Sequence, residues 1–332
     1  MADGQGILSE KSNPIPKNTP MDAISIGKST LKTSRLAFGC WRIAGWDGNP
    51  GPDQEKAGVA AVAAAYDAGY TLFDNADIYG GGHAERLFGK ALHEISGMRD
   101  KVVIASKCGI RVKGNPPGEN TVRWDFSADY IVSAAEQSLK RIGIETLDLL
   151  MLHRPDFLAD PQEIASAFSK LQSAGKVRFF GVSNFRPSLF TAVQAACSMP
   201  LVVHQVEISL AHLNALNDGT LDQCLEFKMT PMAWSPLGAG LLGDGAKRLL
   251  TSQKKYQVGP IVTELQQIAD ELNVSKTAVA LAWLLKHPAG IQPIVGSTTP
   301  ERIRDAVNAT KIELSRSQWY RLLVAAQGEP LP

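Results

Sequence analysis

The chain has 332 residues, of which 20% are charged and 44% hydrophobic, with a formal net charge of +1. This length suits one large α/β domain or two ordinary ones. The balanced charge argues against a surface built for nucleic acid or for an anionic membrane. The longest run of small apolar residues, 59–66, is too short to cross a bilayer. We therefore expect a small-molecule partner, and the sequence leaves open whether the chain is a monomer or a weak oligomer.

Residues 1–20 are polar, contain several Gly and Pro, and lack the basic start and apolar centre of a signal peptide. We predict a flexible tail over 1–20, a single domain over 21–332, and a cytoplasmic location. The four cysteines are scattered and form no metal-binding spacing, so we expect reduced thiols and no metal site. They are Cys40, Cys108, Cys197 and Cys224.

Eight short apolar runs recur along the chain, with helix-like segments between them. Most are continuously apolar, as in parallel strands that are buried on both faces. Eight such units predict a (β/α)8 TIM barrel. The expected strands span residues 36–39, 70–74, 102–106, 147–152, 177–182, 201–206, 232–235 and 292–295. The expected helices span residues 54–68, 84–92, 128–142, 161–174, 187–196, 219–227, 261–272 and 300–309.

A doubly wound sheet is the competing architecture. It would require a glycine-rich dinucleotide fingerprint after the first strand, and the sequence FGCW at residues 38–41 is not one. Two further elements lie outside the eightfold repeat. Residues 23–27 and 30–32 predict an N-terminal hairpin at the bottom of the barrel. The pattern Ser-x-x-Gln at residues 315–318 predicts a capping box and an extra C-terminal helix over 317–326.

Four residues suited to acid–base chemistry lie at or just beyond the ends of predicted strands two, three and four. They are Asp74, Tyr79, Lys107 and His153. Parallel strands end at one rim of a barrel, so these side chains can meet there. An ammonium near a phenol lowers its pKa from about 10 and makes it a better general acid. The set predicts protonation of an oxygen, with Asp74 holding Lys107 and His153 orienting a carbonyl.

Several separated motifs make the chain similar to the aldo-keto reductase superfamily. Residues 73–80 match FDxAxxYG, residues 181–185 match GVSNF, and the Ser-Lys and Leu-His pairs at 106–107 and 152–153 also fit. The resemblance covers about residues 24–326. Residues 37–42, 106–110, 153–156 and 231–235 further resemble the bacterial YdhF-like branch.

This resemblance implies a barrel that binds NAD(P)H across its rim without a Rossmann domain. It makes Tyr79 the proton donor, tuned by Lys107 and Asp74, and it makes His153 the group that orients the carbonyl. It also implies a cofactor site in which side-chain amides bind the nicotinamide carboxamide, an indole stacks on the ring, and backbone amides meet the pyrophosphate. The implied cofactor residues are Gly39, Cys40, Trp41, Ser183, Asn184, Gln205, Trp234, Ser235, Leu237, Gly238, Gly240, Ser297 and Arg302.

In family members, the spacing Ser297-x4-Arg302 binds the 2′-phosphate of NADPH, since a guanidinium recognises phosphate well. Thr299 and Pro300 suit the start of a helix beside it, and a helix N-terminus favours phosphate. Two positions depart from the family pattern. Gly296 stands where many members have Lys, and residue 306 is Ala where many have Asn. We expect NADPH rather than NADH as the cofactor.

Trp41 is expected to wall the substrate pocket, which the loops over 207–218 and 111–125 would complete. The long loop over 237–259 lies at the face of the barrel where substrate and cofactor are usually bound. Arg42 could attract an acidic substrate or simply face solvent. Three functions remain open. The first is NADPH-dependent reduction of aldehydes or ketones, and the second is an NAD-dependent sugar or alcohol dehydrogenase. The third is a non-catalytic, redox-sensing subunit on the same fold.

Overall fold

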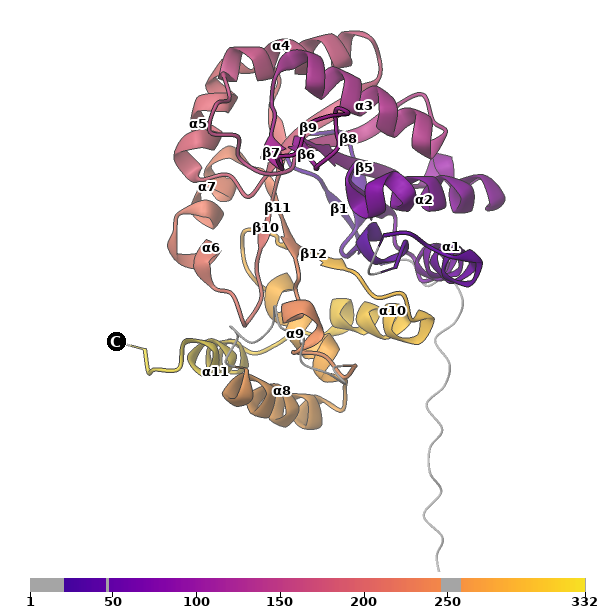
Figure 1. Ribbon diagram of the computed structural model, residues 1–332. Coiled ribbons are helices and arrows are strands. Elements are labelled where there is room, and N and C mark those ends of the chain that lie inside the picture. The colour runs from indigo at the N-terminus through magenta and orange to yellow at the C-terminus, as the bar shows by residue number, and fades with distance from the viewer. Residues whose placement is uncertain (1–20, 46–47, 246–257, 332) are drawn as a thin grey trace, which may run out of the picture.

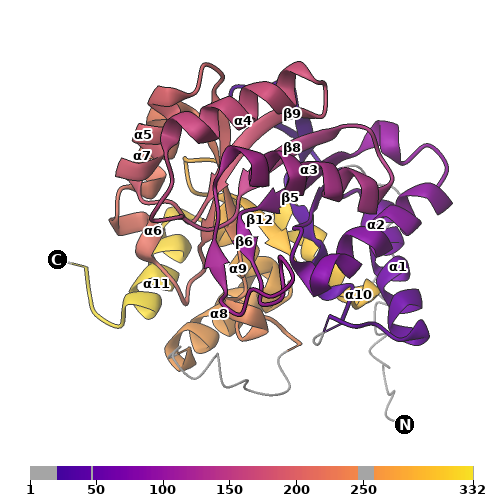
Figure 2. The same cartoon turned by 45° about the horizontal axis from the view of Figure 1, so that its top comes forward.

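A closed barrel of eight parallel strands forms the centre of the computed structural model, which describes residues 21–45, 48–245 and 258–331. The helices surround the strands (Figures 1 and 2). The predicted TIM barrel is therefore confirmed, and the competing architecture, a doubly wound sheet, is excluded. The strands are β3 (Ala37–Gly39), β4 (Leu72–Asp74), β5 (Val103–Cys108), β8 (Leu147–Leu152), β9 (Val177–Ser183), β10 (Leu201–Glu207), β11 (Thr230–Trp234) and β12 (Gln292–Val295).

The predicted helices are present, with ends that differ by up to three residues. The predicted tail over 1–20 lies outside the described residues. Within them, no helix is both long and apolar enough to cross a membrane. The helices are α1 (Pro52–Asp67), α2 (His83–Glu94), α3 (Ala128–Ile142), α4 (Pro161–Ser173), α5 (Pro187–Ala196), α6 (Asn214–Asn217), α7 (Thr220–Phe227), α8 (Gly259–Leu272), α9 (Lys276–Leu285), α10 (Pro300–Ala306) and α11 (Arg316–Gln327).

The third strand of the barrel runs further than its sequence predicts. A strand was expected over 102–106, but β5 continues through Lys107 and Cys108, which pair with Met151 and Leu152 of β8. Lys107 therefore lies within the strand instead of just beyond it. At Lys107 the backbone of β5 pairs with β8, whereas its pairing with β4 ends at Ala105.

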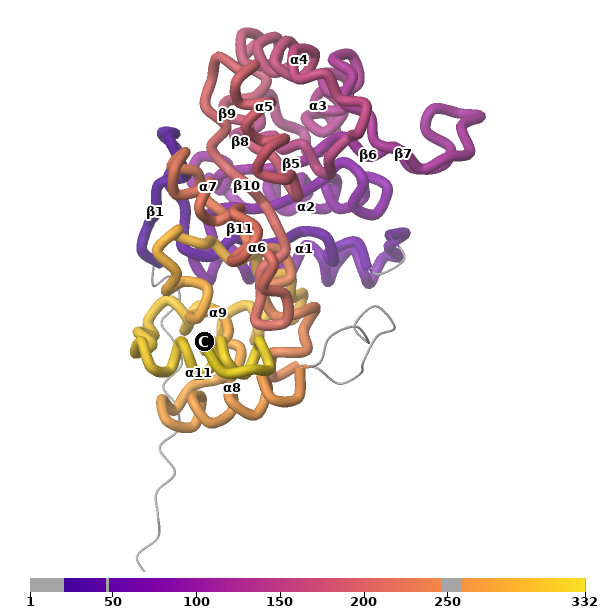
Figure 3. Tube along the Cα trace, turned by 90° about the vertical axis from the view of Figure 1, so that its left-hand side faces the viewer, coloured from indigo at the N-terminus to yellow at the C-terminus, as the bar shows by residue number. Residues whose placement is uncertain are grey.

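Three elements were missed by the sequence pattern. The short helix α6 lies within the segment 207–218, which was expected to be a loop. Helix α9 has no polar face and is buried along its whole length, so it lacks the periodicity that identifies a surface helix. The hairpin β6 (Ile110–Arg111) and β7 (Arg123–Trp124) has strands of only two residues. Figure 3 shows that the segment joining β6 to β7 projects away from the barrel.

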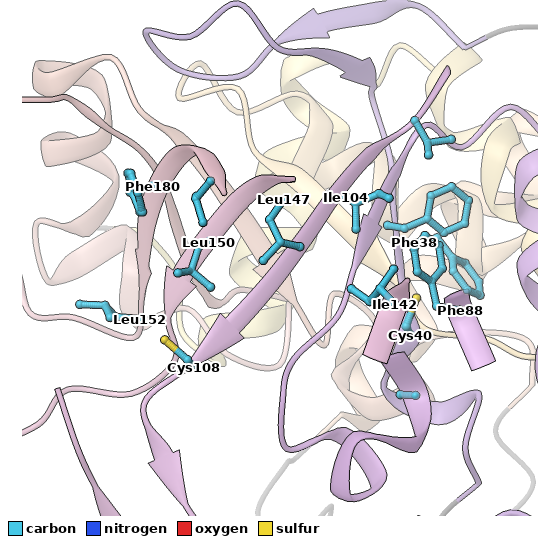
Figure 4. Packing of buried hydrophobic residues seen from close by; sticks show 14 of the residues in the cluster. Phe38, Cys40, Phe88, Ile104, Cys108, Ile142, Leu147, Leu150, Leu152 and Phe180 are labelled. Carbon is cyan, nitrogen blue, oxygen red and sulfur yellow. The ribbon is translucent and has the colours of Figure 1, made fainter. Parts of the chain in front are cut away.

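The core has two layers around the barrel wall. Inside the barrel, strand residues such as Leu149 and Met232 pack together with Ile26 and Leu31 of the N-terminal hairpin. Outside it, larger side chains pack between the strands and the helices (Figure 4). The predicted hairpin is confirmed as β1 (Ala23–Ser25) and β2 (Lys32–Ser34), and the Gly27 amide following β1 donates to Thr230 Oγ1 at 2.9 Å. The bottom of the barrel is thereby closed, which leaves the opposite rim for chemistry.

The predicted C-terminal helix is confirmed as α11, and its capping box is complete. Ser315 accepts from the Gln318 amide, and the Gln318 side chain accepts from the Ser315 amide. Trp319 stacks on Trp283 of α9 with ring centroids 5.1 Å apart, and each indole donates to the other residue's carbonyl. This paired contact attaches α11 to the barrel's outer layer.

Helices α2 and α3 touch backbone to backbone at Gly89. A Cβ added there would lie 2.3 Å from the Ile142 carbonyl oxygen. We expect Gly89→Ala to lower the free energy of unfolding by about 1–3 kcal/mol, because overpacking outweighs the better helix propensity of alanine. Urea titration measures this. Gly259→Ala is the matched control, because a Cβ at that first residue of α8 meets nothing within 4 Å; an equal loss in both variants would contradict the packing explanation.

Candidate active site

One buried ammonium holds three of the four predicted acid–base residues together. Lys107 Nζ donates to Asp74 Oδ2 at 2.7 Å, to the Asn75 carbonyl at 2.8 Å and to the Tyr79 hydroxyl at 3.2 Å. Lys107 is fully buried, so these three partners replace its hydration shell. Strand β4 ends at Asp74, and Tyr79 begins a short 3-10 turn (Tyr79–Gly82) after it. The network therefore lies at the carboxyl ends of neighbouring strands, as the sequence predicts.

The pKa values of this network follow from burial and from the Lys107–Asp74 ion pair. Burial raises the pKa of Tyr79, and Asp74 adds to that effect, while Lys107 acts against it. Burial alone would lower the pKa of Lys107, but Asp74 and Tyr79 raise it above its ordinary value. The expected net lowering of the phenol pKa was thus wrong for this structure. At neutral pH the site holds a protonated phenol beside a charged ammonium.

His153 faces Tyr79 edge to face, with ring centroids 5.7 Å apart. Burial lowers the pKa of His153 well below its ordinary value, and the charges of Lys107 and Arg154 lower it further. The imidazole is therefore neutral at physiological pH and carries one N–H donor. Its Nδ1 has no hydrogen-bond partner among the described residues. Two neutral donors, a phenol and an imidazole, thus lie side by side next to a fixed cation.

The predicted carboxamide-binding residues are joined directly to these groups. Gln205 Nε2 donates to Asp74 Oδ1 at 3.0 Å, so it occupies the carboxylate oxygen that Lys107 does not. Asn184 Nδ2 lies 3.2 Å from the His153 carbonyl and 2.7 Å from Ser183 Oγ. The structure therefore brings all three polar side chains to the edge of the acid–base group. Their contact with a cofactor stays a prediction.

The predicted stacking residue, Trp234, ends β11 and is partly buried. Its Nε1 donates to Asn184 Oδ1 at 3.0 Å, which fixes the plane of the indole. Trp41 is 54% exposed, and its ring centroid lies 6.5 Å from that of Tyr79. By contrast, the Cys40 side chain is fully buried in the hydrophobic core together with buried Gly39, so a bound molecule could meet only the backbone there.

The loop after β11 has a run of left-handed residues, where the sequence predicts a pyrophosphate site. Ser235, Gly238 and Gly240 have φ values of 50°, 55° and 97°. The amides of Gly238 and Gly240 donate to the carbonyls of Ser235 and Leu237, each at 2.9 Å. These two glycines therefore shape the turn, and their amides are already used within it.

The predicted 2′-phosphate residues lie together at the beginning of α10. Thr299 is its N-cap and Pro300 follows, as expected, although Thr299 makes no side-chain capping bond. Ser297 Oγ accepts from the Thr299 amide at 3.2 Å. Arg302 is exposed and its guanidinium lies beside Gly245, in the loop after β11. Because α10 has only seven residues, the basic side chain contributes more to an anion site than the helix end does.

All four cysteine side chains are buried. Burial raises the pKa of Cys108 well above its ordinary value, so this thiol is held in its inert form. All four cysteines are free. Among the described residues, no group of three or more His, Cys, Asp or Glu side chains could hold a metal ion.

A second buried polar network lies behind the first, and the sequence analysis missed it. Fully buried Glu85 accepts from Ser106 Oγ and from Arg141 Nε, each at 2.5 Å. Asp77 lies nearby, with the Tyr130 hydroxyl 3.5 Å from its Oδ2. Burial and the charge of Glu85 raise the pKa of Asp77 to about 7. The sequence indicated this network only through the position of Asp77 within the motif at 73–80, and an aspartate in that loop would ordinarily be expected to face solvent.

The raised pKa of Asp77 predicts a pH-dependent stability. Its folded pKa exceeds the unfolded value, so its stabilising contribution is complete at low pH and is lost as pH rises through about 7. The unfolding free energy of Asp77→Asn minus that of the wild type should therefore become more positive by about 1–3 kcal/mol when the pH is raised from 5 to 8. Urea titrations at the two pH values measure this. Asp67→Asn, at the exposed end of α1, is the control. If the difference in unfolding free energy between Asp77→Asn and the wild type is the same at both pH values, the assignment is refuted.

Comparison with known proteins agrees with this geometry. Residues 35–324 match the model of the Aldo/keto reductase family. The chain is 40% identical over 300 residues to a 6-dehydroglucose reductase from Agrobacterium fabrum, which covers 90% of this chain and 96% of that protein. It is also 40% identical over 311 residues to the oxidoreductase YdhF from Escherichia coli, covering 93% and 99% of the two chains.

Among solved structures, the glycerol dehydrogenase AKR11B4 from Gluconobacter oxydans superposes with a TM-score of 0.81 at 27% identity. That match covers 94% of this chain and 98% of the other. The shared barrel, the family match over most of the chain and the similarity to YdhF confirm the resemblance drawn from the motifs. The chain belongs to the aldo/keto reductase family and is an oxidoreductase.

Proposed function

We propose that this enzyme reduces aldehydes or ketones to alcohols with NADPH, and that Tyr79 supplies the proton. The observation that carries the proposal is the set of bonds made by Lys107 Nζ, 2.7 Å from Asp74 and 3.2 Å from the Tyr79 hydroxyl. A phenol held against a charged ammonium can release its proton and be stabilised as the phenolate. This arrangement suits a reaction in which a carbonyl oxygen gains a proton.

Each residue has a separate task in this scheme. The raised pKa keeps Tyr79 protonated until a carbonyl oxygen arrives, and Lys107 then stabilises the phenolate that remains. Asp74 keeps Lys107 charged and in place. The neutral imidazole of His153 donates a hydrogen bond to the same carbonyl oxygen and so orients it. The nicotinamide cofactor, when bound, supplies the hydride that reaches the carbonyl carbon.

The residues present fit a nicotinamide cofactor. Asn184, Ser183 and Gln205 place amide and hydroxyl groups beside the acid–base network, where a carboxamide would find donors and acceptors. Trp234 offers an indole face next to them. Ser297 precedes α10 and Arg302 lies in its first turn, and a hydroxyl and a guanidinium there favour the additional phosphate of NADPH over NADH.

The reverse reaction is the second candidate, because the similar structure from Gluconobacter oxydans is a glycerol dehydrogenase. Tyr79 would then act as a base on an alcohol, through the same contacts. The first assay separates the directions: NADPH and NADH oxidation is followed at 340 nm with 4-nitrobenzaldehyde, and NADP⁺ or NAD⁺ reduction with glycerol. Faster turnover of NADPH with the aldehyde would support the proposal, and turnover only of NAD⁺ with the alcohol would overturn it.

Tyr79→Phe tests the proton donor. We expect kcat to fall by about 100-fold or more, because general acid catalysis commonly contributes that much, while the Kd for NADPH changes little. Stopped assays of carbonyl reduction give kcat, and quenching of tryptophan fluorescence gives Kd. Tyr66→Phe, on the outside of the barrel in α1, is the control. Retention of most of the rate by Tyr79→Phe would remove the phenol from the mechanism.

Arg302→Ala tests the cofactor assignment. Loss of a guanidinium from a phosphate site should raise the Kd for NADPH by about 10-fold or more and leave the Kd for NADH within about 2-fold. Arg304→Ala removes an exposed arginine from the same helix and serves as the control. If Arg302→Ala raises the Kd for NADPH and the Kd for NADH by the same factor, the guanidinium does not bind the 2′-phosphate.

A further inference from the structure

Arg154 is a charged residue at the rim for which the proposed function gives no role. It directly follows His153 and is partly buried. Its guanidinium carbon lies 5.4 Å from the ring centroid of Trp234. Its charge also contributes to the lowered pKa of His153, which shows that the two groups are close enough to interact.

The position of this guanidinium is fixed by a short series of contacts. Asn184 lies 3.2 Å from the His153 carbonyl through Nδ2 and accepts from Trp234 Nε1 through Oδ1. Arg154 lies over the indole that Asn184 fixes, a favourable cation–π arrangement. The cation therefore lies close to both Trp234 and His153, the residues proposed to meet the cofactor and the carbonyl.

The charge of Arg154 is not balanced within the part of the chain that the structure describes. No carboxylate there lies within ion-pair distance of it. The nearest acid in the sequence, Asp156, accepts instead from the amides of Phe126 and Leu158, each at 2.9 Å. The other cation of the site, Lys107, is paired with Asp74. Arg154 therefore differs from Lys107 in having no ion-pair partner among the described residues.

We propose that Arg154 is a specificity-determining residue that binds an anionic group, such as a carboxylate, on the carbonyl substrate. This inference rests on the proposed carbonyl reduction and adds a substrate class to it. A partly buried guanidinium with unused N–H donors gains most from a charged, bidentate oxygen acceptor.

Matched pairs of aldehydes test the proposal. 3- and 4-carboxybenzaldehyde are compared with their methyl esters, which keep the ring and the aldehyde but remove the charge. Of the two carboxybenzaldehydes, the one that the wild type reduces more efficiently should have a kcat/KM at least about 10-fold higher than that of its methyl ester. In Arg154→Gln this ratio should fall at least about 10-fold, mainly through KM of the acid, and Arg154→Lys should restore part of it.

The control and the opposing outcomes are defined by the same assay. Lys170→Gln removes an equal charge from the exposed face of α4 and should leave the acid-to-ester ratio unchanged. A wild type that reduces the esters as well as the acids, or an Arg154→Gln variant with an unchanged ratio, overturns the proposal but not carbonyl reduction. A larger loss in Arg154→Gln for neutral glyceraldehyde than for the acids assigns the guanidinium to hydroxyl groups and also overturns it. Failure to reduce any aldehyde overturns both.

Discussion

The candidate site depends on a lysine ammonium that is fully buried. Removing such a charge from water costs several kcal/mol, and only close, well-aligned partners offset that cost. Lys107 finds them in Asp74, the Asn75 carbonyl and the Tyr79 hydroxyl. These contacts come from one segment that leaves the end of β4, so they form only if β4 and β5 pair in one register. In that register Asp74 lies opposite Ala105, two residues before Lys107. The geometry of the barrel and the electrostatics of the site therefore require each other.

Burial shifts the pKa values of the two hydrogen-bond donors beside this cation in opposite directions, and each shift favours the neutral form of the group. It raises the pKa of Tyr79 and lowers that of His153, so each group is neutral at physiological pH. A neutral phenol and a neutral imidazole can both donate to one carbonyl oxygen. Because Asp74 balances Lys107, this acid–base group has no excess charge of its own. Beside this group lies the guanidinium of Arg154, 5.4 Å from the ring centroid of Trp234 and without an ion-pair partner among the described residues.

The sequence was sufficient to predict the barrel and the positions of Asp74, Lys107 and His153. Continuous apolar runs mark parallel strands, and a polar residue where such a run stops must lie at one rim. The same reasoning could not predict that Gln205 donates to Asp74, because the two residues are 131 positions apart and lie on strands that are not neighbours in the barrel. It also missed α9, whose uniform burial removes the helical period. The net direction of the Tyr79 pKa depends on burial, which composition does not reveal.

Asn184 connects the indole of Trp234 with the segment that carries His153. Its φ of 60° is a left-handed conformation that costs a residue with a side chain about 1–3 kcal/mol, although asparagine tolerates it better than most. The amide uses this conformation to reach His153, Ser183 and Trp234 at once. A residue in the ordinary strand conformation would point its side chain to one face of the sheet and could not join β8, β9 and β11 in this way. The indole that would support a cofactor and the imidazole that would orient a carbonyl therefore share one strained residue, and a shift in either is transmitted to the other.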